Sequence, residues 1–158
     1  MTITSATPQA VQAFLDERQG LFRAFDHDLK HGVSANEIAR MAAPAVSRPV
    51  VLAYLNAKEL AADVHRILRS ARLEGIFGAD ITGEIGRGAR VVHLTLVVDP
   101  QEIERDQDTL VMHLADILLP EGIRLDTPEQ SSIAEALWDG ESVRLRRQKR
   151  QRAQHTGS

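Results

Sequence analysis

Residues 33–56, VSANEIARMAAPAVSRPVVLAYLN, decide the fold of the first part of the chain. Ser34 is a residue type that caps helix N-termini, and Glu37 follows three positions later, as it does in a capping box. Three apolar residues then recur at helical spacing, namely Ile38, Ala39 and Ala42. The pattern predicts a short helix that begins after Ser34.

A second helix is predicted directly after a proline turn. Pro44 cannot continue a helix interior, because it lacks the amide hydrogen and its ring clashes with the preceding turn. The helix restarts with Ser47 as the N-cap and Pro49 in the first turn, where no amide partner is needed. Val51 and Leu55 lie four positions apart and are expected to face inward. The first turn, which carries an arginine, is therefore expected to be exposed.

The two predicted helices resemble the helix-turn-helix of bacterial transcription regulators and site-specific recombinases. The pattern of these proteins is approximately I-A-x-x-A-G-V-S-x-x-T-V-x-x-x-L. The matching residues of this chain are Ile38, Ala39, Ala42, Val46, Ser47, Val51 and Leu55. Residues 43–45, Ala-Pro-Ala, replace the turn glycine and make the turn about two residues longer, and Val50 stands where a polar residue is common. The resemblance covers about one sixth of the chain.

The resemblance implies that the helix over residues 47–56 enters the major groove of DNA. The residues expected to read bases are Ser47, Arg48, Pro49, Val50 and Ala53. The residues expected to hold phosphates are Ser34, Asn36, Tyr54 and Lys58. Arg48 is the type of side chain that takes a guanine edge with two hydrogen bonds. Because any short helical hairpin imitates this pattern, a purely structural hairpin stays open as the alternative.

Two further arginine-rich stretches are candidates for contact with DNA. Gly86-Arg87-Gly88 together with Arg90 predicts either a wing that reaches a minor groove or an ordinary hairpin tip. The basic C-terminal tail has two interpretations. It is either an arm that binds nucleic acid or an acidic surface, or a terminus that only increases solubility. Its cations are Arg144, Arg146, Arg147, Lys149, Arg150 and Arg152.

The composition fits a globular protein with an uneven distribution of charge. The 158 residues are 43% hydrophobic and carry a net charge of -3. Residues 1–73 hold nine Lys/Arg and seven Asp/Glu. Residues 74–143 hold four Lys/Arg and fifteen Asp/Glu, and residues 144–158 hold six Lys/Arg and no Asp/Glu. The lack of cysteine excludes disulfides and thiol chemistry. No signal peptide or membrane span stands out, which predicts a cytoplasmic protein.

The remaining elements are predicted from periodicity and from turn residues. A helix with three of the four phenylalanines over residues 8–31 is expected to be the main packing partner of the helix-turn-helix. A further amphipathic stretch begins at Asn56. The later elements are strands at 76–85 and 89–98, a helical region after Pro100, a strand at 123–126, a helix at 127–137 and a strand at 142–146. The predicted class is α+β, with a helical head followed by a β-β-α-β-α-β domain.

These features predict three regions and one function. The regions are a DNA-binding domain at 1–73, an acidic dimerisation or sensing domain at 74–147, and a basic tail at 148–158. The predicted function is a transcription regulator, such as a repressor, that reads double-stranded DNA as a homodimer. The dimer interface is expected on the strand at 91–98 and the apolar helix face at 110–118. Whether a small-molecule or protein effector binds the second domain is left open by the sequence.

The alternative class is a protein-protein interaction module of the transcription or replication machinery. No nucleophile-base pair, phosphate loop or catalytic carboxylate pair has a supporting context, so neither an enzyme activity nor a cofactor is predicted. His27 and His31 lie four apart on a helix, but no third ligand is placed near them by the sequence. No metal site is therefore predicted.

Overall fold

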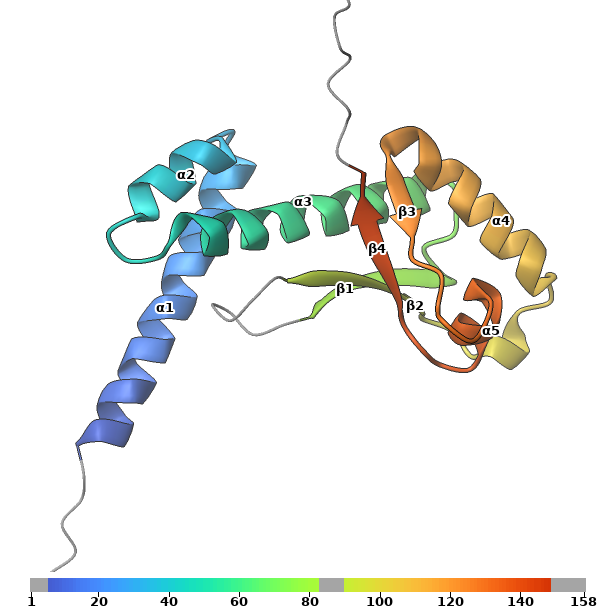
Figure 1. Ribbon diagram of the computed structural model, residues 1–158, viewed down its shortest axis with the longest axis horizontal. Coiled ribbons are helices and arrows are strands. Elements are labelled where there is room, and N and C mark those ends of the chain that lie inside the picture. Colours follow the sequence, from blue (N-terminus) through green and yellow to red (C-terminus); the bar gives the residue numbers. More distant parts are fainter. Residues whose placement is uncertain (1–5, 83–89, 149–158) are drawn as a thin grey trace, which may run out of the picture. The chain divides into compact units, whose positions relative to one another are not determined.

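Five α-helices and four β-strands make up the described part of the chain, residues 6–82 and 90–148 of the computed structural model (Figure 1). The helices are α1 (Thr7–Lys30), α2 (Ala35–Ala42), α3 (Arg48–Ser70), α4 (Gln107–Leu118) and α5 (Ile133–Trp138). The strands are β1 (Phe77–Thr82), β2 (Val91–Leu96), β3 (Ile123–Leu125) and β4 (Val143–Arg147). The α+β class predicted from the sequence is confirmed.

The chain divides into two compact units between Leu55 and Asn56. This boundary lies inside α3, well before the boundary near residue 73 expected from the sequence. The two boundaries differ because the amphipathic stretch from Asn56 onward is the continuation of α3. No proline or glycine interrupts the helix there, and its later residues pack into the core of the second unit.

The first unit consists of α1, α2 and the first two turns of α3. α1 has a proline in its first turn and stays continuous through Gly20. It ends at Lys30, two residues before Gly32, whose φ of 86° is the left-handed conformation that glycine adopts without strain. Only the C-terminal half of α1 packs, through the buried Phe22 and Phe25. Phe14, the third phenylalanine of α1, is 62% exposed and lies outside this packing.

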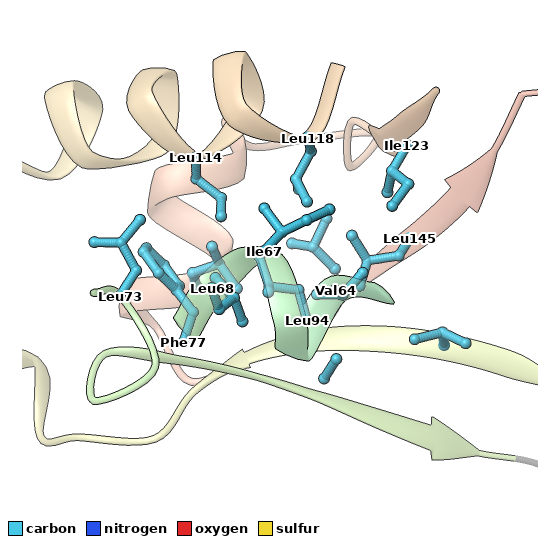
Figure 2. Close-up of a cluster of buried hydrophobic side chains, with 14 of the residues drawn as sticks. Val64, Ile67, Leu68, Leu73, Phe77, Leu94, Leu114, Leu118, Ile123 and Leu145 are labelled. Carbon is cyan, nitrogen blue, oxygen red and sulfur yellow. The ribbon is translucent and has the colours of Figure 1, made fainter. Parts of the chain in front are cut away.

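The second unit is an antiparallel sheet with helices on one face. The strand order is β1-β2-β4-β3, and each neighbouring pair is antiparallel. Figure 2 shows side chains of α3 and α4 pointing toward those of the strands. The largest buried side chains here are Leu68, Leu73, Phe77, Leu94, Leu114, Leu118, Ile123 and Leu137. Val143 and Leu145 of β4 join this core, which spans all the strands.

Side-chain caps set the starts of α4 and α5. Asp106 accepts from the amide of Thr109 at 3.0 Å and thereby begins α4. Ser132 and Glu135 form a capping box at the start of α5. Because that box fixes the helix start, α5 begins at Ile133, several residues later than the sequence predicted.

The surfaces expected to form a dimer interface belong to the core of the second unit. Val92 and Leu94 of β2 are 2% and 0% exposed, and the inward face of α4 is buried as well. These buried residues are therefore not available to a dimer interface, because a two-layer domain needs such apolar faces for its own folding. Among the described helices, none combines the length and apolar character needed to cross a lipid bilayer.

Candidate nucleic-acid interface

Packing between α1, α2 and α3 holds the first turn of α3 in place. Val51 and Leu55 are fully buried, as the sequence predicted, and Ile38 of α2 is buried as well. The ring of Phe22 lies 4.7 Å from that of Tyr54, with the two planes at 82°. This edge-to-face contact is favourable for aromatic pairs. The inner side of α3 is thus fixed, and the opposite side of its first turn is presented to solvent.

The connection between α2 and α3 is a tight, self-bonded turn. The amides of Ala45 and Val46 both donate to the carbonyl of Ala42, at 2.9 and 2.8 Å. Val46 turns inward and is 8% exposed. Pro44 fits at the tip because it has no amide hydrogen to satisfy. The lengthened turn therefore stays compact and leads directly into α3.

The start of α2 is held by the cap predicted from the sequence. The hydroxyl of Ser34 accepts from the amide of Glu37 at 3.2 Å. This bond satisfies one of the unpaired amides of the first turn. It also places Asn36, the second residue of α2, on the exposed surface next to α3.

A hydrogen bond joins the exposed sides of α2 and α3. The guanidinium Nη2 of Arg48 donates to the side-chain oxygen of Asn36 at 2.7 Å. Both residues are exposed and line a concave surface between the two helices, and the hollow that it bounds has a volume of about 550 Å³. The other lining residues are Ser34, Glu37, Ala39, Arg40 and Ala43. The bond restricts Arg48, a flexible side chain, at the position expected to read a base.

The expected base-reading residues all lie at the start of α3. Ser47, Arg48 and Pro49 are exposed, and Val50 and Ala53 are half-buried. The structure brings these five residues together within two helical turns. It also places Ser34 and Asn36, two of the expected phosphate contacts, at the neighbouring start of α2.

Tyr54 is corrected from a phosphate ligand to a core residue. Its side chain is 5% exposed, and its hydroxyl donates to Oδ2 of Asp26 at 2.7 Å. The sequence did not reveal this role because the partner lies 28 positions earlier, on α1. Lys58, the other expected phosphate contact on α3, is half-buried and belongs to the second unit.

The predicted wing lies largely outside the described residues. Gly86, Arg87 and Gly88 fall in the stretch at 83–89, and Arg90 is half-buried just before β2. In the tail, Lys149, Arg150 and Arg152 also lie outside the described residues.

One residue of this concave surface was not among the residues predicted from the sequence. Arg40 lines the same concave surface as Arg48, and its Nη2 lies 3.2 Å from Oε1 of Glu37. The available signal was its spacing, because Arg40 lies four positions after Asn36 and therefore on the same helix face. Arg40 and Arg48 together give the concave surface two cations against one carboxylate.

Metal and acid-base groups add little to this site. The rings of His27 and His31 stack at 4.1 Å, and the described residues contain no group of three or more metal-binding side chains. The amide and hydroxyl of Thr109 lower the pKa of Asp106, at the start of α4. That group belongs to a helix cap in the second unit.

Comparison with models of known families, with curated protein sequences and with solved structures found no match.

Proposed function

We propose that this chain is a sequence-specific DNA-binding transcription regulator with a helix-turn-helix head followed by an α+β domain. The observation that carries the proposal is the exposed first turn of α3, where Arg48 is held by Asn36 above a packed three-helix core. A rigid helix that presents an arginine in its first turn is what major-groove recognition requires. We propose the cytoplasm as its compartment.

The role proposed for Arg48 is to read a guanine edge in the major groove. Its guanidinium has five N–H donors, so it can keep one bond to Asn36 while it donates two to the base. Asn36, with its other polar atoms exposed to solvent, is then available to a phosphate of the same strand. This pairing explains why the side chain is held in place before DNA arrives.

The test is enrichment from a random duplex library, carried out with the full chain and with Arg48→Ala. Arg48→Ala is expected to lose about 1 to 3 kcal/mol of binding free energy on the preferred sequence. Its base preference should be relaxed at one position of that sequence. Arg23→Ala is the matched control, because Arg23 is exposed on α1 and bonds only to the carbonyl of Gln19 among described residues. An equal loss of affinity on every sequence would mean that Arg48 contacts phosphates rather than a base. No enrichment by the wild-type chain would overturn the proposal in favour of an adaptor.

A homodimer remains part of the proposal, with α1 as its contact. Since one recognition helix reads few base pairs, two heads are needed for useful specificity. The largest exposed apolar group in the first unit is on α1, where Val11, Phe14 and Leu15 are 50%, 62% and 42% exposed. Their i, i+3, i+4 spacing forms one stripe on a helix half that does not pack within the first unit (Figure 1).

The partner that fits this half of α1 is the same apolar stripe in a second copy of the chain. The fourteen residues from Thr7 to Gly20 are all exposed or nearly so and would span about 21 Å. A helix pair of this length buries less surface than most stable dimers. We therefore propose an association that is weak in free solution and is reinforced when both heads bind one DNA molecule.

A further inference from the structure

The sheet of the second unit exposes a group of arginines on the face that the helices do not cover. Ile123, Val143 and Leu145 are buried in the core at 1%, 2% and 2% exposure. Because side chains alternate along a strand, the residues between and after them point to the other face. These are Arg124 of β3 and Arg144 and Arg146 of β4, all exposed, and we call them the arginine face.

The register brings these cations close together. Arg124 is directly opposite Arg146, and Arg144 is directly opposite His93 of β2. Neighbouring strands lie about 4.8 Å apart, and like charges directly opposite one another destabilise a sheet. The arrangement is therefore unfavourable for the isolated domain.

The domain neutralises this charge only in part. Arg146 is paired with Asp126, Nε to Oδ2 at 3.6 Å, and its side chain is still 59% exposed. Among the described residues, neither Arg124 nor Arg144 has an ion pair. By contrast, Arg147, which points to the other side, is paired with Asp63 of α3. Three cations thus share one carboxylate within a segment that is otherwise acidic.

The chemistry of this face fits a phosphate backbone. Arginine donates paired N–H groups to phosphate oxygens, and a polyanion would offset the repulsion between Arg124 and Arg146. Among the described strand residues, the other acidic side chain on this face is that of Asp80, which lies on β1 at the opposite edge of the sheet.

The absence of aromatic residues favours a duplex over a single strand. The chain has six Phe, Tyr and Trp residues, and those of the second unit are Phe77, which is buried, and Trp138 on α5, 6.4 Å from it. Proteins that bind single strands stack bases on aromatic rings. The arginine face offers charge without such a platform.

We infer that the arginine face is a second contact surface for the phosphates of duplex DNA. This inference rests on the proposed function and extends it to the second unit. The head would supply sequence preference, while the arginine face would supply affinity that is independent of sequence. The overall acidic charge of the second unit does not oppose this, because phosphate attraction depends on the local face.

The test compares the full chain with the double variant Arg124→Gln, Arg144→Gln on random duplex DNA over a range of salt concentrations. Loss of two phosphate contacts is expected to make the slope of log K against log salt shallower by about 1.8, at about 0.9 per contact. The same slope, taken from 1 M to 0.1 M salt, corresponds to roughly 60-fold weaker binding at 0.1 M. The sequence preference of the head should be unchanged.

Arg105→Gln is the matched control, because it removes one exposed cation from an acidic part of the same unit. A double variant that behaves like this control would overturn the inference and leave the proposed function intact. Wild-type protein that binds no duplex at low salt would overturn both. Equally strong wild-type binding to polyglutamate would also contradict it and would indicate an acidic protein partner.

A stability measurement separates a binding role from a structural one. Because Arg124 and Arg146 repel each other, Arg124→Gln should leave Tm unchanged or raise it while duplex binding falls. A drop in Tm that parallels the drop in binding would mean that the arginines support the fold, and would overturn the inference.

Discussion

Replacing Tyr54 by Phe separates the structural role of this residue from a role in DNA binding. The change removes only the hydroxyl that donates to Asp26 at 2.7 Å, and it keeps the edge-to-face contact with Phe22. A hydrogen bond to a charged group contributes about 1.5 to 3 kcal/mol. Asp26 is half-buried and can recover water, so the lower part of that range applies. We expect a loss of about 1 to 2 kcal/mol, or a 5- to 30-fold change in the folded-to-unfolded ratio.

The assay is amide hydrogen exchange in peptides from α1, α2 and the start of α3. Protection there should fall in Tyr54→Phe, while peptides from α4 and β4 serve as the internal comparison. Asp26→Asn should give a similar loss, and the double variant should lose less than the sum, because both changes break the same bond.

DNA affinity of the folded Tyr54→Phe protein should match that of the wild type. A variant with normal protection and weakened duplex binding would refute this reasoning and return Tyr54 to the phosphate contacts.

Three further predictions follow from the described contacts. Phe14→Glu should weaken self-association about 100-fold, since burying the exposed part of the ring in both copies is worth about 3 kcal/mol in total. Met112→Glu on α4 is the control in sedimentation. Unchanged association of Phe14→Glu would exclude α1 as the contact. Gly78→Ala should destabilise by about 1 to 3 kcal/mol in urea unfolding, because a Cβ would lie 2.7 Å from Cγ1 of Val97, and adding Val97→Ala should restore most of the loss. The pKa of Asp106 is lowered by its bonds to a threonine, so its stabilisation of α4 is present above its unfolded pKa and is lost as pH falls through the lower folded value. Asp106→Asn should remove that part of the acid transition, as followed by circular dichroism.

Local signals predicted much of the first unit. The cap at Ser34 and the inward positions of Val51 and Leu55 depend on residues close together in sequence, and the structure confirms them. The mixed helix-sheet class followed from the same kind of periodicity.

The errors concern contacts between residues far apart in sequence. The partner of Tyr54 lies on another helix, and nothing near Tyr54 in the sequence specifies it. Phe14 has the same helical periodicity as Phe22, yet only Phe22 meets other helices. The reverse error affected β2 and α4, whose apolar faces were assigned to a dimer although the domain buries them itself. Periodicity identifies an apolar face but not the surface that covers it.

The arginine face illustrates the same limit. The alternation of Arg144 and Arg146 can be read from the sequence of β4. Their position beside Arg124 depends on the pairing of β3 with β4, which is known only once the sheet is formed.

The most direct test of the central claim is the affinity of the full chain for random duplex DNA as a function of salt. A helix-turn-helix head that binds DNA should give measurable binding at low salt and a linear fall of log K with log salt, with a preferred sequence that Arg48→Ala loses. A folded chain without duplex affinity at low salt, where phosphate contacts are strongest, would contradict it.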